Sequence, residues 1–211
     1  SGCALLDCVL GGGWALARIA NIVGDKSTGK TLEAIEICCN FLLKFPTIGK
    51  IRYAEPEAAF DKSYAATLGL PIDRVDFAED DSIHTVEDFS EDLNRFLDSL
   101  EDGEPGLYVL DSLDALSSDA EMERGIKDKS FGGEKAKKMG EMFRRLNQKI
   151  KKKRVLVLII SQVRDNIGVT FGEKHTRTGG KALDFFASQI LWFAQTQVLR
   201  RVINKVTRAV G

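Results

Sequence analysis

The feature that most constrains the fold is a run of eight residues, Gly24-Asp25-Lys26-Ser27-Thr28-Gly29-Lys30-Thr31, which matches the phosphate-loop pattern G-x-x-x-x-G-K-[ST] in full. It lies between an apolar stretch and a stretch with helical periodicity. Glycines let backbone N–H groups converge, and a helix N-terminus adds a favourable dipole for anions. All eight residues are therefore predicted to bind nucleotide phosphates, with the Lys30 charge on the β- and γ-phosphates and the Thr31 hydroxyl on Mg²⁺.

Strands and helices alternate along the rest of the chain. Predicted strands cover residues 19–23, 51–55, 75–78, 107–111, 155–161, 189–194 and 198–206, and predicted helices cover residues 30–43, 60–68, 86–100 and 135–151. This alternation predicts an α/β fold with a mainly parallel, twisted sheet and helices on both faces, in a single domain over residues 1–211. Ligands are expected at the carboxyl ends of the strands. Two polar stretches, residues 117–133 and 164–180, are predicted as long loops.

Composition limits the other classes of function. The net charge of −1 neither favours nor excludes nucleic acid, so a DNA contact needs a local basic surface. The longest apolar run, residues 155–160, is too short to cross a bilayer, so no membrane partner is expected. The four cysteines (Cys3, Cys8, Cys38 and Cys39) lack metal or redox spacing and are predicted to be reduced thiols of a cytoplasmic protein.

Carboxylates near predicted strand ends are candidates for the metal and the reaction. Asp111 follows the apolar run 107–110, which is the Walker B arrangement and predicts support of Mg²⁺. Glu55 and Glu57 follow the second strand, and either could position or deprotonate a water molecule. Spacing alone does not choose between these two, and a solvated loop carboxylate remains the alternative for each.

Four blocks of the sequence carry a family signature: the phosphate loop and residues 57–69, 110–116 and 161–183. The last block is the most specific, because Ile-Gly-Val-x-Phe-Gly and Thr-Gly-Gly follow each other at an ungapped spacing. From about Leu5 to Ser188 the chain resembles bacterial RecA and its phage-encoded relatives. The resemblance implies a RecA-like ATPase core that binds ATP and Mg²⁺.

The same resemblance implies roles for individual residues. It places Glu57, not Glu55, at the catalytic carboxylate, acting with Lys30. It places Gln162 at the glutamine that senses the γ-phosphate and relays its presence to the following loop. Asp61 and Tyr64 are implied to lie against the adenine, although ordinary core packing is the alternative for Tyr64.

Two DNA-binding loops are also implied, at residues 117–133 and 164–180. Basic side chains there can replace the counterions of DNA phosphates, and an aromatic ring can stack on bases. The predicted DNA-binding residues are Arg124, Lys127, Lys129, Arg164, Phe171, Lys174, Arg177 and Lys181. The implied activity is that of a recombinase, which coats single-stranded DNA as a helical filament, pairs it with double-stranded DNA and hydrolyses ATP when DNA is bound.

A denser basic run, residues 149–154, has two readings. It can contact DNA, or it can be the solvent-facing end of a helix, where cations complement the helix dipole. The second reading needs no partner and is favoured.

The sequence also departs from the family pattern. Asp25 replaces a proline, and Asp184 stands where the family carries a basic residue at the subunit interface. The family's N-terminal oligomerisation segment and C-terminal domain are expected to be absent from residues 1–211. Two other functions therefore stay open: another RecA-fold ATPase, such as a DnaB-like hexameric helicase or a KaiC-like switch, and a non-catalytic nucleotide-binding regulator of a recombinase.

Overall fold

A computed structural model describes residues 1–78, 83–122, 134–165, 175–178, 180–198, 200–203 and 206–209. Six strands form one parallel sheet in the order β3-β2-β4-β5-β1-β7. Their bounds are β1 Arg18–Gly24, β2 Lys50–Ala54, β3 Val75–Phe77, β4 Gly106–Leu110, β5 Val155–Asp165 and β7 Ala187–Phe193. A short strand, β6 (His175–Arg177), pairs antiparallel with the end of β5. The predicted α/β class with a mainly parallel sheet is confirmed.

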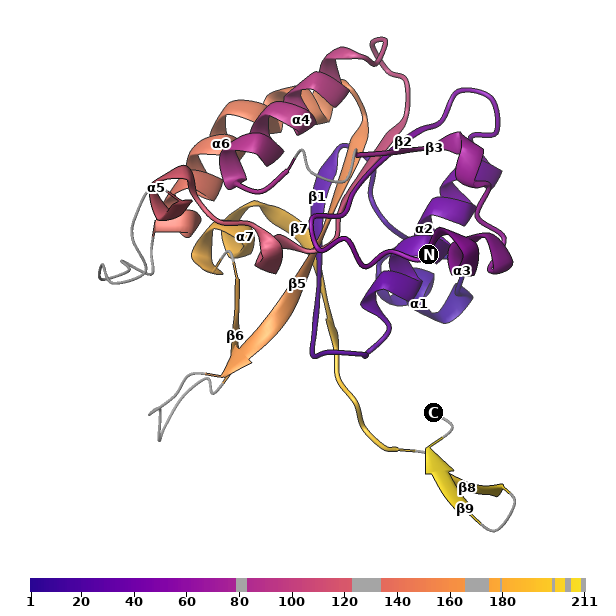
Figure 1. The fold of residues 1–211 in the computed structure, drawn as a ribbon. Helices are drawn as coiled ribbons and strands as arrows, with labels where there is room; N and C mark the ends of the chain where they lie inside the picture. Colours follow the sequence, from indigo (N-terminus) through magenta and orange to yellow (C-terminus); the bar gives the residue numbers. More distant parts are fainter. Residues whose placement is uncertain are drawn as a thin grey trace.

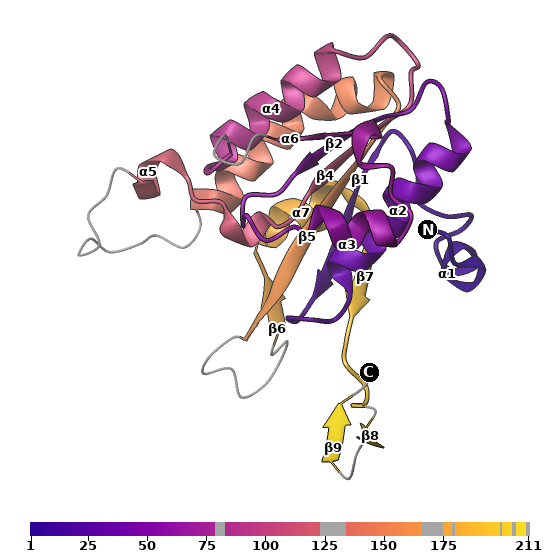
Figure 2. The same ribbon diagram turned by 45° about the vertical axis from the view of Figure 1, so that its right-hand side comes forward.

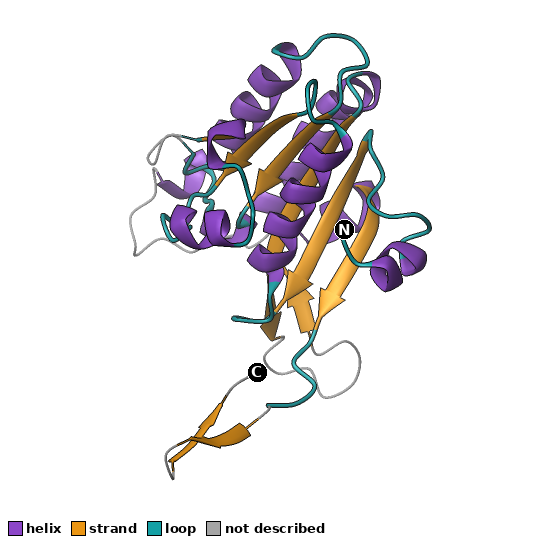
Figure 3. Ribbon diagram, turned by 90° about the vertical axis from the view of Figure 1, so that its right-hand side faces the viewer, coloured by secondary structure: helices purple, strands orange, loops and turns teal. Residues whose placement is uncertain are grey.

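Helices cover both faces of this sheet (Figure 1). They are α1 Ala4–Val9, α2 Lys30–Lys44, α3 Lys62–Thr67, α4 Val86–Asp98, α5 Asp119–Met122, α6 Glu134–Lys152 and α7 Gly180–Phe186, with the 3₁₀ turns η1 Ile72–Arg74 and η2 Leu113–Ala115. Figure 3 shows the sheet enclosed between its helices. Such two-sided burial explains why every residue of β4, and every residue of β1 after Arg18, is buried without alternation.

Two hydrophobic cores result, one on each face. The first lies under α4, α6 and α7 and includes Phe89, Phe143 and Leu183. The second lies under α2 and α3 and includes Ile35 and Ala65. Because both cores press on the central strands, the positions of the strand ends are held firmly, and the functional candidates lie at these ends.

The structure differs from the predicted elements mainly in its last third. The stretch 164–180 is not one loop, because β5 continues to Asp165 and its last residues pair with β6. α7, which was not predicted, begins at Gly180. The predicted strand 198–206 is a hairpin instead, β8 (Arg200–Ile203) with β9 (Val206–Ala209), and it lies away from the main sheet in both Figure 1 and Figure 2.

Candidate nucleotide site

The phosphate loop connects β1 to α2 at the carboxyl edge of the sheet. The backbone is in the left-handed region at Ser27 (φ 60°) and at Gly29 (φ 94°). A Cβ atom at Gly24 would lie 2.6 Å from Thr28 Oγ1 and 3.0 Å from the Phe193 backbone oxygen, so this position has no room for a side chain. The loop therefore curls tightly, as a cradle for phosphate requires.

The start of α2 is open to an anion. Its N-cap is Gly29, and no side chain caps the first turn, so the first backbone N–H groups have no side-chain acceptor. Lys30 Nζ donates a hydrogen bond to the Asp25 carbonyl oxygen at 2.7 Å. Burial lowers the pKa of Lys30, opposed by the carboxylates of Asp111 and Asp114. The ammonium is thus held at the loop, where it can meet phosphate oxygens.

Hydroxyl and carboxylate oxygens meet beside the loop, where Mg²⁺ is expected. Thr31 Oγ1 donates a hydrogen bond to Asp111 Oδ2 at 2.7 Å, and the Tyr53 hydroxyl donates to the same oxygen at 3.0 Å. Burial raises the pKa of Asp111, and these two hydrogen bonds oppose that rise. The Thr31 hydroxyl and the Asp111 carboxylate are hard oxygen donors suited to Mg²⁺ and its water shell, so the residues fit this ion.

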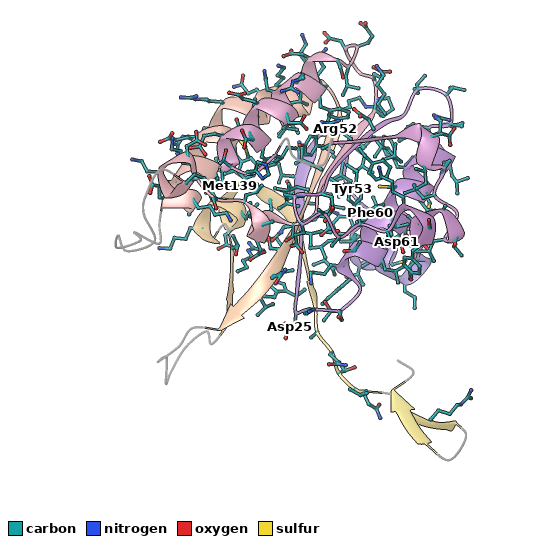
Figure 4. The ribbon with its side chains drawn as sticks, viewed as in Figure 1. Asp25, Arg52, Tyr53, Phe60, Asp61 and Met139 are labelled. Atoms are coloured by element: carbon teal, nitrogen blue, oxygen red, sulfur yellow. The ribbon has the colours of Figure 1, made fainter. Side chains whose placement is uncertain are left out.

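Tyr53 was not predicted as part of the site. It is a buried residue of β2, and its ring packs against that of Phe60 with 4.6 Å between the centroids. Figure 4 labels both residues. Burial raises the pKa of its hydroxyl well above the usual value, so the group stays protonated and donates. The sequence shows only an aromatic residue in a strand, and its contact with Asp111 requires the pairing of β2 with β4.

The two glutamates after β2 have different surroundings. Glu55 accepts hydrogen bonds from the backbone N–H of Ala59 at 2.9 and 3.1 Å, and so closes the turn after the strand. Glu57 Oε1 accepts a hydrogen bond from Ser112 Oγ at 2.5 Å, and Gln162 Nε2 lies 3.5 Å away. Glu57 therefore contacts residues at the ends of β4 and β5 as well as following β2. Glu55 instead stabilises the turn in which it lies.

Asp114 is a further carboxylate at this edge, and it was not predicted. Its Oδ2 accepts a hydrogen bond from the Gln162 backbone N–H at 2.6 Å, and its Oδ1 accepts one from the Thr178 hydroxyl. Motif matching offers no signal for it, because the contact joins η2 to residues far along the chain.

The two residues predicted to face adenine lie at the start of α3. Asp61 is the N-cap of this helix and accepts a hydrogen bond from the Tyr64 backbone N–H at 2.9 Å. The Tyr64 ring is about half exposed and lies outside both hydrophobic cores. The core-packing alternative for Tyr64 therefore does not describe this structure.

Of the predicted DNA-binding residues, few can be placed. Arg124, Lys127, Lys129, Phe171 and Lys174 lie outside the described residues, and for Arg164 only the backbone, in β5, is described. Lys181 is exposed on α7. Arg177 is different, because its side chain is only 4 % exposed.

Arg177 is held by partners within the protein. Its Nη1 donates to Asn21 Oδ1 at 2.6 Å, its Nη2 pairs with Asp184, and its guanidinium lies 5.8 Å from the centre of the Trp192 ring. In this arrangement the guanidinium is held by groups of its own chain, and the DNA-binding role of Arg177 stays a prediction. The Asp184 charge here neutralises a buried arginine.

The basic run at residues 149–154 is also paired internally. Lys149 forms an ion pair with Asp98 at 2.6 Å, and Lys152 and Lys153 both pair with Asp102 at 2.9 Å. These carboxylates lie at and just after the end of α4. The run therefore joins α6 to the end of α4, which agrees with the reading that needs no DNA.

Comparison with known proteins identifies the family. The sequence matches the family model for the RecA N-terminal domain over residues 1–210. It is 33 % identical to Protein RecA of Symbiobacterium thermophilum over 213 residues, which cover 99 % of this chain and 58 % of that protein. Identity is 36 % with Protein RecA of Streptococcus gordonii, over 89 % of this chain and 47 % of that protein. Identity with Protein RecA of Nostoc punctiforme is 34 %, over 95 % of this chain and 53 % of that protein.

The chain spans about half the length of these curated relatives. Among the described residues, no helix is long and apolar enough to cross a membrane. The match over nearly the whole chain agrees with the parallel sheet and with the phosphate loop at its carboxyl edge. The chain belongs to the RecA family.

Proposed function

We propose that this chain is the ATP-binding and ATP-hydrolysing core of a DNA-dependent recombinase. In the proposal the protein assembles with ATP as a helical filament on single-stranded DNA and pairs that strand with double-stranded DNA. Family membership supports this general role. The observation that carries the hydrolytic part is the position of Glu57, between Ser112 and Gln162 and beside the phosphate loop.

The proposed chemistry follows from this edge of the sheet. The loop N–H groups, the α2 N-terminus and Lys30 bind the phosphates, and Thr31 and Asp111 hold Mg²⁺. When bound, Mg²⁺ neutralises charge that develops on the phosphate oxygens. Glu57 orients a water molecule and accepts its proton, which is general-base catalysis. Gln162, whose Nε2 lies 3.5 Å from Glu57 Oε1, is proposed to sense the terminal phosphate.

The first test separates nucleotide binding from turnover. Lys30→Ala removes a charge-assisted contact of roughly 1.5–3 kcal/mol, so ATP affinity should fall roughly 10- to 100-fold. Lys44→Ala, at the opposite end of the same helix, is the matched control and should bind ATP like the wild type. An unchanged dissociation constant for Lys30→Ala would contradict the phosphate-site assignment.

The second test chooses between the two glutamates. Glu57→Gln should bind ATP but lower its hydrolysis by about 10²- to 10⁴-fold, the usual contribution of a general base. Glu55→Gln keeps an acceptor oxygen for the Ala59 N–H and should retain hydrolysis within a few-fold of wild type. Full turnover by Glu57→Gln would remove this residue from the mechanism.

One observation favours a second function, a nucleotide-binding regulator without recombinase activity. Asp184 pairs with Arg177 of its own chain and offers no cation to a neighbouring subunit. Nucleotide binding without hydrolysis, in the natural full-length protein and with single-stranded DNA present, would favour this second function.

A further inference from the structure

Asp114 joins two parts of the chain that form the stems of one hairpin. β5 and β6 pair through Val163 with Arg177, and through the next two residue pairs outward. Gln162 and Thr178 are the next positions inward, at the root of this hairpin. One Asp114 oxygen accepts from the Gln162 N–H and the other accepts from the Thr178 hydroxyl. A single carboxylate therefore bridges the two stems at the root of the hairpin.

The same carboxylate lies close to the nucleotide site. It belongs to η2, which follows Asp111 and Ser112 at the end of β4. Its negative charge raises the pKa of the Lys30 ammonium, and among the neighbouring carboxylates only Asp111 has a larger effect on that pKa. The Gln162 side chain points toward Glu57 while its backbone N–H is held by Asp114. A shift of the Gln162 backbone, which carries the side chain implied to sense the terminal phosphate, would therefore shift or break a contact of Asp114.

The return stem is fixed on its other side as well. Arg177, adjacent to Thr178, is bound by Asn21 of β1. The amide of Asn21 donates to the Ile159 carbonyl oxygen at 2.8 Å and to Ser161 Oγ at 3.0 Å. These groups are buried, and buried hydrogen bonds in a low-dielectric interior are costly to break. The Asp114 carboxylate joins this return stem to η2, which follows the end of β4 on the nucleotide side.

We propose that Asp114 is a positioning residue that couples the occupancy of the nucleotide site to the β5–β6 hairpin, and through it to the affinity for single-stranded DNA. The inference rests on the proposed function, because residues 166–174 between these strands belong to the predicted second DNA-binding stretch. It adds to the role implied for Gln162 a second residue, which fixes both stems at once.

The experiment compares single-stranded DNA affinity in two nucleotide states, with the natural full-length protein. Fluorescent oligo(dT) is titrated in the presence of Mg²⁺ with either a non-hydrolysable ATP analogue or ADP. The ratio of the two dissociation constants is the coupling, which for allosteric proteins is about 5- to 150-fold. Thermal unfolding is recorded for every variant, so that lost stability and lost coupling are separated.

Asp114→Ala and Thr178→Val each remove one end of the proposed link. Each should reduce the affinity ratio to about twofold or less, well below the usual range for coupled sites. The affinity ratio of the double variant should be no lower than that of Asp114→Ala alone, because both substitutions remove the same link. Asp73→Asn, which removes an exposed carboxylate on η1, is the control and should keep the wild-type ratio.

Several outcomes would overturn the inference. An Asp114→Ala protein that unfolds at a lower temperature but keeps the wild-type ratio would show a purely structural role. If Asp114→Ala does not fold, Thr178→Val decides by the same ratio, and a wild-type ratio there overturns the proposal. A wild-type protein with no DNA affinity in either nucleotide state would instead overturn the proposed function itself, and the inference with it.

Discussion

At the scale of single residues, Asp111 combines a functional position with a cost to stability. Its carboxylate is buried, and both Thr31 and Tyr53 donate to one of its oxygens. Burial still raises its pKa, which means that the folded protein favours the protonated form more than the unfolded chain does. Metal support needs the ionised form, so the side chain that is proposed to serve Mg²⁺ opposes folding at neutral pH.

The sign of this effect can be tested with Asp111→Asn. A group whose pKa is raised on folding contributes stability below its unfolded pKa, and loses that contribution as the pH rises through the folded pKa. Without Mg²⁺ and nucleotide, the variant should therefore melt at a higher temperature than wild type at pH 7. The difference should shrink as the pH falls toward 3.8, the usual pKa of aspartate. Thermal unfolding across this pH range is the measurement.

The same variant should lose function while it gains stability. Added Mg²⁺ and ATP should stabilise the wild type, by ~2.7 kcal/mol at a ligand concentration 100 times the dissociation constant, and should stabilise Asp111→Asn much less. Asp73→Asn, at an exposed position, should differ from wild type in neither respect. An Asp111→Asn protein that is less stable than wild type at pH 7 would show that the hydrogen bonds outweigh the burial of the charge.

At the scale of elements, the sequence predicted the long, strongly patterned segments and missed the short ones. α2, α4 and α6 were predicted as helices, α4 from its apolar periodicity, and the apolar stretches of β1 and β5 predicted strands. α7 has only seven residues, begins at a glycine and fully buries a single leucine, Leu183, so no periodicity was available. β6 has three residues and exists because of its pairing with β5, which local sequence cannot show.

The ion pair between Arg177 of β6 and Asp184 of α7 yields a prediction about the charge of residue 184. Asp184→Lys restores the basic type expected from the family but places a second cation beside the buried Arg177. Loss of this charge-assisted hydrogen bond should lower the free energy of unfolding by ~1.5–3 kcal/mol. The loss is smaller than for a fully buried pair, because Asp184 itself is 62 % exposed.

Chemical denaturation of Asp184→Lys and of Asp73→Lys, the exposed control, measures this difference. The control reverses the same charge without a buried partner and should change stability by no more than about 0.5 kcal/mol. Equal stabilities for both variants would mean that Arg177 does not depend on Asp184.

At the scale of the whole molecule, topology explains which parts of the site could be foreseen. Parallel strands bring their carboxyl ends to one edge, so the phosphate loop, Asp111 and Glu57 were expected together. The order of the strands in the sheet could not be predicted from the sequence, and neither could the side-chain contacts that depend on this order. Tyr53 reaches Asp111 because β2 lies beside β4, and Asp114 meets Gln162 because β4 lies beside β5. Tyr53 and Asp114 belong to no sequence motif, so only the structure reveals their contacts at the site.

The same edge explains why nucleotide and DNA are expected to act on each other. The nucleotide candidates and the root of the β5–β6 hairpin are joined through Gln162 and Asp114. A local change at the phosphates can therefore bias the arrangement of a segment predicted to bind DNA, which is a ligand-set switch.

The most direct test of the central claim is ATP hydrolysis by the natural full-length protein, with and without single-stranded DNA, at two salt concentrations. The account predicts that DNA stimulates hydrolysis, that the stimulation weakens at the higher salt because DNA phosphates are held by cationic groups, and that Glu57→Gln abolishes it. Hydrolysis that does not respond to DNA at either salt concentration would contradict the account and indicate an ATPase of the RecA family with a different task.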